Sequence, residues 1–237
     1  YTNDASDNCT FTVAQTAGLP TASTFPVGTT TNTFVVTDAS GNTATCSFNV
    51  TVEDLENPNA VCQNISVALD ANGAAHILAS QIDGGSTDNC AIDTIFHSIC
   101  DFTCANAGAN TVSLTVLDIY GNSSTCNATV TIIDSVAPTA LCQNAVVILD
   151  GNGAGSIGVG DIDDLSYDNC AIDAYSLSNT TFGCANTGAN TVTLTVTDAA
   201  GNSSSCTSTV TVIDNCLLYT SDAADDMQCV DLGGRRI

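Results

Sequence analysis

Basic residues are almost missing from this chain of 237 residues, in which lysine and arginine together occur only 2 times. Aspartate and glutamate occur 25 times, so the formal net charge at pH 7 is -23. A surface of this charge repels nucleic-acid phosphates and anionic lipids, which argues against both as partners and makes cations the natural counter-charge. No hydrophobic run is long enough to cross a membrane, so membrane insertion is not expected in this chain.

Zinc-binding spacing is missing as well. The chain has no Cys-x-x-Cys pair and only 2 histidines, so its 13 cysteines are not arranged as the ligands of a zinc ribbon. A reducing cytosol would keep so many cysteines as thiols, and the sequence therefore predicts disulfides and an extracellular or cell-surface location. Because a signal peptide and a starting methionine are also missing, we expect an internal fragment whose export signal lies upstream.

An internal repeat organises the sequence. Two phrases recur at a spacing of about 80 residues: Leu69–Ala74 (LDANGA) returns as Leu149–Ala154 (LDGNGA), and Asp88–Asp93 (DNCAID) returns as Asp168–Asp173. The cysteines of the two full copies keep the same spacing; they are Cys62, Cys90, Cys104 and Cys126, then Cys142, Cys170, Cys184 and Cys206. A partial copy that begins with the DNC triplet Asp7–Cys9 precedes them.

Alternation of apolar and polar residues dominates each copy, as in Val112, Leu114 and Val116. A period of two predicts β-strands with one buried face. Asn72-Gly73 and the DIYGN segment at 118–122 suit tight hairpin turns, because Asn and Gly tolerate positive φ. Together these signals predict an all-β fold of tandem immunoglobulin-like β-sandwich repeats of about 80 residues. The expected limits are a partial repeat at 1–57 and full repeats at 58–137 and 138–215.

The partial copy carries a family resemblance. Its DNC triplet, the phrases GLP and STFPVGT, the TDASGN turn, and Cys46 followed by FNVTV resemble the HYR, or hyalin repeat, domain over Asp7–Pro58. The two full copies look like divergent relatives found in bacterial surface proteins, with FTCANAG or FGCANTG in place of TFPVGT. The resemblance implies an immunoglobulin-like fold and an extracellular adhesive or spacer role.

The cysteines are expected to pair within each copy. First-strand and last-strand cysteines should give Cys62–Cys126 and Cys142–Cys206, and the DNC cysteines should give Cys90–Cys104 and Cys170–Cys184. Other connectivities of four cysteines stay open at this point. Partners for Cys9 and Cys46 are expected upstream. Cys100, which has no counterpart in the next copy, is interpreted as a buried thiol, with a swapped pairing to Cys90 or Cys104 as the alternative.

Calcium is the best ligand hypothesis. The segments between copies place Asp54 and Glu56, then Asp134, shortly before a proline, and the D-x-x-GN turns supply Asp118 and Asp198. Calcium takes six to eight oxygen ligands, so such carboxylates could hold it and stiffen the array. The alternative is that Asp and Asn in these positions only form turns. No other cofactor is required by any motif, and the acidic run at 161–168 is interpreted as a solvated loop.

Catalytic signals are weak. His76 and His97 are replaced by Ser156 and Leu177 in the next copy, and neither histidine has a nucleophile at motif spacing. We therefore predict that the chain is not an enzyme. The leading hypothesis is a structural or adhesive module whose partners are the neighbouring repeats of the same chain. The alternative is a glycan- or protein-binding accessory domain of an exported enzyme, with a cell-surface glycan or protein as its ligand.

The last segment, 216–237, has a different composition. It holds both basic residues, Arg235 and Arg236, and the single methionine. Its phrases CLLYTSDAAD and VDLGGRRI resemble the translation of a sequencing adapter, so we expect a non-native tail in which Cys216 and Cys229 have no structural meaning.

Overall fold

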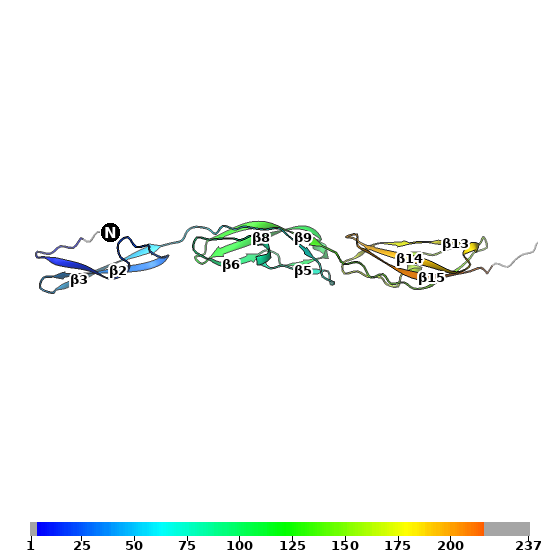
Figure 1. Cartoon of the computed structure of the whole chain (residues 1–237), viewed down its shortest axis with the longest axis horizontal. Coiled ribbons are helices and arrows are strands. Elements are labelled where there is room, and N and C mark those ends of the chain that lie inside the picture. Colours follow the sequence, from blue (N-terminus) through cyan, green and yellow to red (C-terminus); the bar gives the residue numbers. More distant parts are fainter. Residues whose placement is uncertain (1–3, 216–237) are drawn as a thin grey trace, which may run out of the picture. The chain divides into compact units, whose positions relative to one another are not determined.

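The protein folds almost entirely into β-strands. The computed structural model describes residues 4–215, and the predicted adapter segment 216–237 lies outside this range. Fifteen strands alternate with short turns, and the only helices in the described range are single turns (Figure 1). No helix in this range is long and apolar enough to span a membrane. The all-β class predicted from the period-two alternation is therefore confirmed.

Residues 4–57 form one antiparallel sheet of three strands, in the order β1 (Phe11–Ala17), β2 (Gly28–Asp38) and β3 (Thr43–Val52). On one face of this sheet Phe34 stacks on Phe48 across the strand pair, with ring centroids 6.1 Å apart. Aromatic cross-strand pairs of this kind stabilise a sheet by packing.

The next two regions contain the same succession of elements with the same strand lengths. The first has β4 (Ile65–Ala68), β5 (Ala74–His76), α1 (Ala79–Ile82), β6 (Ile92–His97), β7 (Asp101–Thr103), η1 (Cys104–Asn106), β8 (Gly108–Asp118) and β9 (Ser123–Ile133). The second has β10 (Ala145–Ile148), β11 (Ala154–Ser156), α2 (Val159–Ile162), β12 (Ile172–Leu177), β13 (Thr181–Gly183), η2 (Cys184–Asn186), β14 (Gly188–Asp198) and β15 (Ser203–Ile213). Each set forms a four-stranded and a two-stranded sheet, ordered β4-β9-β8-β6 with β5-β7, and β10-β15-β14-β12 with β11-β13.

The core of the second region explains its sequence pattern. Three alternate residues of β14, Val192, Leu194 and Val196, are fully buried, and Phe182 of β13 and Ile162 of α2 belong to the same apolar cluster. The intervening threonines face outward. Burying such side chains contributes roughly 1.5 to 3 kcal/mol each, which is why a period of two specifies this layer.

The turns are formed by aspartate, asparagine and glycine, as predicted, but one of them does not join paired strands. The Asp198–Asn202 turn connects β14 to β15, which pair directly from Thr197 opposite Ser203. The Asn72-Gly73 turn, predicted as a hairpin, connects β4 to β5, and these strands lie in different sheets. That hairpin prediction is wrong, because the tight turn changes sheet instead of returning along its own strand.

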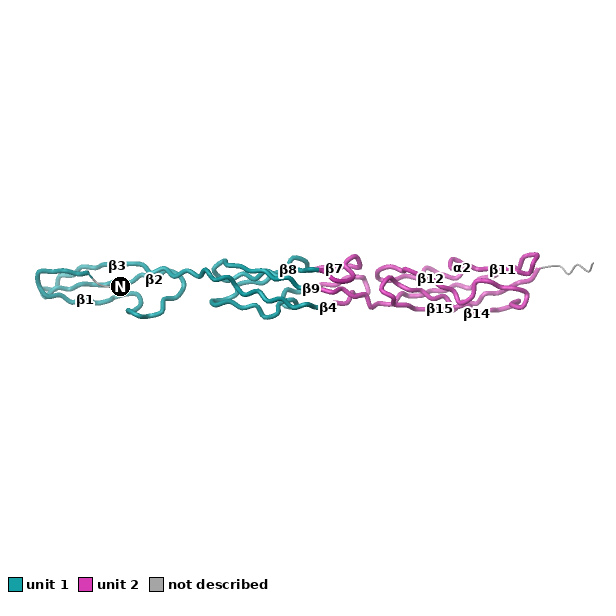
Figure 2. The backbone as a smooth tube through the Cα atoms, turned by 90° about the horizontal axis from the view of Figure 1, so that it is seen from above, with its two compact units in different colours: residues 1–65, 78–100, 111–129 teal, residues 66–77, 101–110, 130–237 magenta. Residues whose placement is uncertain are grey.

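Contacts divide the chain into two compact units (Figure 2). The first comprises 1–65, 78–100 and 111–129, and the second comprises 66–77, 101–110 and 130–237. The repeat limits expected at residues 57, 137 and 215 stay predictions.

In each of these two regions one disulfide links a cysteine that precedes the first strand to a cysteine on the last strand. Cys62 bonds Cys126 and Cys142 bonds Cys206, both with Cα atoms 5.8 Å apart, which are the pairs expected from the sequence. Closing a loop of 64 residues in this way stabilises a fold by about 4 kcal/mol in the chain-entropy treatment.

The third disulfide corrects the predicted pairing of the DNC cysteines. Cys104 bonds Cys170 with Cα atoms 5.5 Å apart, so the predicted bonds Cys90–Cys104 and Cys170–Cys184 do not form. Strand geometry gives the reason. Cys170 lies near Ile172, which is opposite Asp198 at the end of β14, whereas Cys184 precedes the start of β14. An 11-residue strand is roughly 33 Å long, far beyond the reach of a disulfide.

The remaining cysteines of the described range differ in exposure. Cys9, Cys46, Cys90 and Cys184 are exposed thiols, and Cys100 is half-buried. The swapped pairing of Cys100 with Cys104 is contradicted, because Cys104 is bonded to Cys170.

Candidate metal centres

The first cluster of candidate ligands consists of Asp54, Asp88 and Cys90, whose ligand atoms all lie within 4.8 Å of one another. Asp54 follows β3, and the other two belong to the DNC triplet before β6. Asp88 Oδ2 accepts hydrogen bonds from the backbone N–H groups of Cys90 (2.8 Å) and Ala91 (3.0 Å). This Asx turn fixes the carboxylate of Asp88 through Oδ2, and its second oxygen, Oδ1, takes no part in the turn.

A turn asparagine holds Asp54 in place. Asn122 Nδ2 donates to the carbonyl oxygen of Asp54 (3.1 Å) and to Asp118 Oδ2 (2.7 Å). Asp54 Oδ1 in turn accepts the backbone N–H of Glu56 (3.2 Å). The segment after β3 is therefore tied to the β8–β9 turn through one amide side chain, and its carboxylate is brought beside the DNC triplet.

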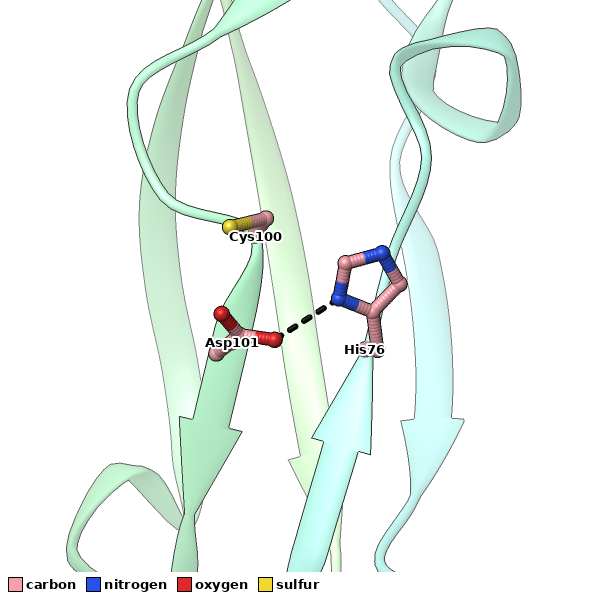
Figure 3. A group of neighbouring side chains, drawn as sticks. All are labelled: His76, Cys100 and Asp101. Atoms are coloured by element: carbon pink, nitrogen blue, oxygen red, sulfur yellow. Dashed lines mark hydrogen bonds and ion pairs between the residues drawn. The ribbon is translucent and has the colours of Figure 1, made fainter.

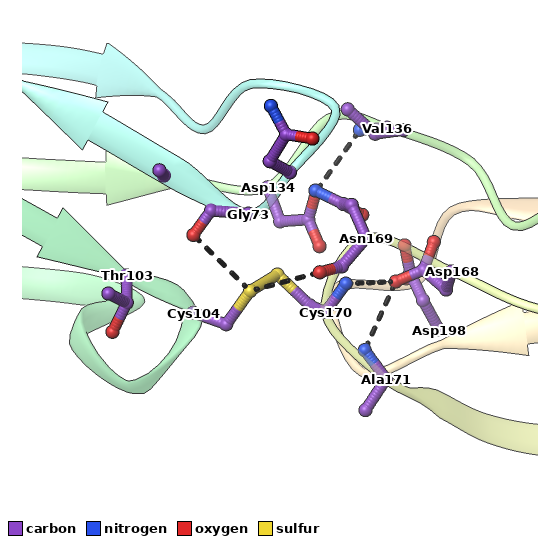
Figure 4. Close-up of a disulfide and its surroundings, with 12 residues drawn as sticks. Gly73, Thr103, Cys104, Asp134, Val136, Asp168, Asn169, Cys170, Ala171 and Asp198 are labelled. Carbon is purple, nitrogen blue, oxygen red and sulfur yellow. Dashed lines mark hydrogen bonds between the residues drawn. A yellow bond between two sulfur atoms is a disulfide. The ribbon is translucent and has the colours of Figure 1, made fainter.

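The second cluster consists of Asp134, Asp168 and Asp198, again with ligand atoms within 4.8 Å of one another (Figure 4). Asp168 Oδ2 accepts the backbone N–H groups of Cys170 (2.9 Å) and Ala171 (3.1 Å), as Asp88 does in the first cluster. Here the cysteine beside the aspartate is bonded to Cys104, and the third member of the group is the carboxylate of Asp198.

Asn202 positions the second cluster. Its Nδ2 donates to the carbonyl oxygen of Asp134 (3.2 Å) and to Asp198 Oδ2 (2.8 Å), which repeats the role of Asn122. Asn169 Nδ2 donates to Asp134 Oδ1 (3.3 Å). The geometry of both clusters therefore comes from the same pair of motifs, a D-x-x-GN turn and a DNC triplet.

Several buried oxygens of the clusters lack hydrogen-bond donors. No N–H or O–H group of the described residues reaches Asp54 Oδ2, Asp88 Oδ1, Asp168 Oδ1 or Asn169 Oδ1. An acceptor that is buried without a partner costs roughly 1 to 3 kcal/mol, and more when it is charged. Converging, unpaired carboxylate and amide oxygens are the ligand type that hard cations such as calcium prefer.

Negative charge around the first cluster also affects its cysteine. A hydrogen bond to Asp54, partial desolvation, and the charges of Asp54, Asp88 and Asp118 raise the pKa of the Cys90 thiol to about 11. The thiol therefore stays protonated at neutral pH, which makes it a poor nucleophile.

The carboxylate of Asp118 accepts hydrogen bonds from residues of its own turn. Its Oδ1 accepts the backbone N–H groups of Tyr120 and Asn122, both at 2.8 Å, and its Oδ2 accepts Asn122 Nδ2. Burial acts to raise the pKa of Asp118, but these hydrogen bonds, with one from the Gly121 backbone, lower it overall. The alternative interpretation of the D-x-x-GN aspartates, as turn formers, therefore describes Asp118 well.

The structure brings together part of the predicted calcium set. Three of the predicted residues lie in the clusters: Asp54, Asp134 and Asp198. Asp118 is outside the 4.8 Å group of the first cluster, and its charge reaches Cys90. Glu56 is exposed and its Oε2 accepts Asn89 Nδ2 at 3.0 Å, so it borders the first cluster without joining it.

Sequence reasoning missed Asp88 and Asp168. Both belong to the DNC triplet, which was interpreted only for its cysteine. The available signal was the recurrence of the whole triplet, since a fixed Asp two residues before a Cys is the spacing of an Asx turn that orients a carboxylate.

His76 forms an ion pair with Asp101 (Figure 3). Its Nδ1 lies 2.7 Å from Asp101 Oδ1, and the two residues are directly opposite each other in the β5–β7 pair. Both side chains are mostly exposed, at 58% and 76%, so the pair contributes little stability. Ser156 and Thr181 occupy the equivalent register of β11 and β13, so this pair is not a repeated feature.

Comparison with known proteins gives one family match. Residues 2–52 match the family model of the HYR domain. No curated protein sequence matches this chain. Solved cadherin structures are similar at low identity. They include protocadherin gamma B7 extracellular cadherin domains 1-4 (10% identity, TM-score 0.36, covering 78% of this chain and 58% of that one). Mouse clustered PcdhgC3 EC1-3 (15%, 0.33, 81% and 79%) and Drosophila N-cadherin EC1-4 (10%, 0.37, 80% and 59%) are further examples.

The chain spans less than two thirds of the first and third of these structures, at 58% and 59% of their lengths. The family match covers the segment that carries the DNC, STFPVGT and TDASGN motifs. The match to the HYR family model over residues 2–52 confirms the resemblance that these motifs predicted.

Proposed function

We propose that this chain is a non-catalytic structural or adhesive part of a secreted or cell-surface protein, built from immunoglobulin-like repeats at 1–57, 58–137 and 138–215. The observation that carries the proposal is the recurrence of one element set with one disulfide, Cys62–Cys126 and Cys142–Cys206. The strands and the disulfide of the first region recur in the second, whereas the polar His76–Asp101 pair does not. Selection for a shape and not for a reaction accounts for this pattern.

Mechanical extension tests the structural role. Each disulfide removes 64 residues from the stretch of chain that force can extend, so reduction should release roughly 20 nm of additional contour length per disulfide. The full chain is pulled by its ends before and after treatment with a reductant. Equal contour lengths in both states would contradict the structural proposal, because they would mean that the disulfides do not limit the stretch of chain that force can extend.

A ligand-binding accessory role is the second candidate. A cleft of about 360 Å³ lies beside the first cluster, and the apolar side chains of Leu55 and Tyr120 on its wall are 80% and 45% exposed. Exposed apolar groups beside a cleft are a feature of binding sites. Saturable binding of the chain to a glycan array, lost in Tyr120→Ala, would favour this role over the purely structural one.

The two clusters are proposed as calcium sites that stiffen the chain. Support comes from the unpaired, buried oxygens Asp54 Oδ2, Asp88 Oδ1 and Asp168 Oδ1, because a divalent cation would offset the cost of burying them next to other carboxylates. Two or three protein carboxylates leave room for backbone oxygens and water in the six to eight positions that calcium takes.

Calorimetric titration and thermal melting test the calcium proposal. At a calcium concentration 100 times the dissociation constant, binding adds about 2.7 kcal/mol to the free energy of unfolding, which raises the melting midpoint. Asp168→Asn should remove binding at the second cluster and Asp88→Asn at the first. Asp164→Asn, an exposed acid outside the clusters, is the matched control.

An unchanged midpoint at millimolar calcium would overturn the calcium proposal. So would an equal loss of binding in Asp164→Asn and Asp168→Asn, because it would assign binding to the overall charge of -23 and not to the clusters.

A further inference from the structure

Cys184 has the same surroundings as Cys104. Each opens a 3-10 turn, η2 and η1 respectively. Cys104 Sγ lies 3.7 Å from the carbonyl oxygen of Gly73, and Cys184 Sγ lies 3.8 Å from that of Gly153. Both glycines have φ of 73°, and a Cβ on either would approach the sulfur to 2.6 or 2.5 Å. A close approach of sulfur to a left-handed glycine turn is therefore built into both places.

The Cys104 site shows what this arrangement holds. Cys104 is bonded to Cys170 of a DNC triplet. Asn169 of the triplet contacts the turn that contains Gly73, because its Nδ2 donates to the Asp70 carbonyl oxygen at 3.1 Å. A Cβ at Gly73 would also lie 2.7 Å from the Asn169 carbonyl oxygen, so glycine is needed for the triplet to dock. The Asp70–Gly73 turn and Cys104 together form a receptor for a DNC triplet.

The Asp150–Gly153 turn has the same internal structure. Asp150 Oδ1 accepts the backbone N–H groups of Asn152 and Ala154, both at 2.9 Å, as Asp70 Oδ1 does at 2.8 and 3.0 Å from Asn72 and Ala74. Cys184 beside it is an exposed thiol that forms no disulfide among residues 4–215.

We propose that Cys184 and the Asp150–Gly153 turn form a covalent docking site for the DNC triplet of a further copy of this repeat. The proposal rests on the repeat organisation argued above. Its rule is that the cysteine of the C-A-N turn in one copy bonds the DNC cysteine of the next copy along the chain.

Cys90 provides the complementary case. It belongs to a DNC triplet, but the preceding copy has no cysteine in the loop between β1 and β2, which is the place that corresponds to Cys104. Cys90 accordingly forms no disulfide, and its thiol faces the Asp54 carboxylate instead. The disulfide thus forms where the preceding copy has the cysteine of the C-A-N turn, as for Cys170. It is missing where the preceding copy lacks that cysteine, as for Cys90.

The chemistry is ordinary thiol–disulfide exchange. The Cys184 thiolate attacks a small disulfide such as glutathione disulfide, which forms a mixed disulfide and releases one glutathione thiolate. The DNC thiolate then attacks the Cys184 sulfur and releases the second glutathione. Two protein thiols are oxidised, one glutathione disulfide is reduced, and two protons accompany the two glutathione thiolates.

An extended chain tests the proposal. Residues 216–237 are replaced by a second copy of 136–215, which places the Cys170 of the added copy 66 residues after Cys184, the same separation as between Cys104 and Cys170. After refolding with glutathione disulfide, peptide mapping without reduction should find Cys184 bonded to that cysteine. Native alkylation of this Cys184, which we expect in the parent chain because the thiol is exposed there, should be lost.

Cys184→Ser in the extended chain is the matched control, and it should leave the Cys170 of the added copy as an alkylatable thiol. The Cys142–Cys206 bond of the added copy shows that this copy has folded. A folded added copy together with an alkylatable Cys184 would overturn the docking proposal and leave the repeat organisation intact. An added copy that fails to form its own Cys142–Cys206 bond would count against the repeat organisation, and with it against the docking proposal.

Discussion

The first and second clusters share two aspartate positions and differ in their third member and in one disulfide. Each places a DNC aspartate beside an acid from the segment that precedes it in sequence, and each is held by a turn asparagine, Asn122 or Asn202. In the first cluster the DNC cysteine is a thiol next to Asp54, whereas in the second it is covalently bound to Cys104. The turn and triplet motifs therefore position the carboxylates in both clusters. Whether a cluster is also cross-linked depends on a cysteine distant in sequence, which is Cys104 for the second cluster.

The largest expected effect comes from removing that cross-link. Cys104→Ser opens a loop of 66 residues and should lower the free energy of unfolding by about 4 kcal/mol in the chain-entropy treatment. The denaturation midpoint in urea measures the loss. Cys184→Ser removes an exposed thiol that forms no disulfide and should change stability by less than about 0.5 kcal/mol. Equal midpoints for the two variants would show that the disulfide does not stabilise the second cluster.

The turn asparagines should differ in importance because only the second cluster is cross-linked. Asn122→Ala removes the hydrogen bond that holds the Asp54 segment, and we expect calcium affinity at the first cluster to fall roughly 10-fold. Asn202→Ala should have a smaller effect, since the Cys104–Cys170 bond still restrains the second cluster. Calorimetric titration measures both affinities.

Asn42→Ala is the control for these variants. Asn42 closes an equivalent turn through Asp38, with Nδ2 to Oδ2 at 2.7 Å, but neither residue belongs to a cluster. Calcium affinity should be unchanged in this variant. A loss equal to that of Asn122→Ala would mean that turn stability, and not the positioning of Asp54, governs binding.

Thiol reactivity offers a smaller and more local test. Because the pKa of Cys90 is raised to about 11, its alkylation at pH 8 should be slow and should accelerate as pH approaches that value. Asp54→Asn removes the largest cause of the raised pKa, so alkylation at pH 8 should become roughly 10-fold faster. Mass-spectrometric rates at Cys90 measure the change. Asp164→Asn should have no effect, and an identical rate in both variants would contradict the role of Asp54.

The smallest expected effect is the acid sensitivity of the turns. Hydrogen bonds from Asn122, Tyr120 and Gly121 outweigh burial and lower the pKa of Asp118 in the folded state. A lowered carboxylate pKa stabilises the fold fully above the ordinary value of 3.8, and this stabilisation is lost as pH falls through the lowered value. The melting midpoint of Asp118→Asn should therefore lie below that of the parent chain at pH 6, and the two should converge toward pH 2.5.

Much of this architecture could be read from the sequence because its signals are local. Val192, Leu194 and Val196 alternate with outward threonines, and this alternation alone predicts which face of β14 is buried. The Cys142–Cys206 pair follows from one cysteine before the first strand of a repeat and one on the last, which lie side by side when β10 pairs with β15. The DNC cysteines were mispaired because spacing along the chain does not reveal that β14 separates Cys170 from Cys184.

The sequence by itself determined the strands, the turns, the acidic surface and the need for disulfides, since each depends on residues near one another or on composition. Only the tertiary structure decided which cysteine meets which, that Asp88 and Asp168 face the acids of the preceding segment, and that their second oxygens are buried without donors. Those outcomes depend on which strand ends meet in space, and the lengths and directions of whole strands, not any local pattern, fix where the ends lie.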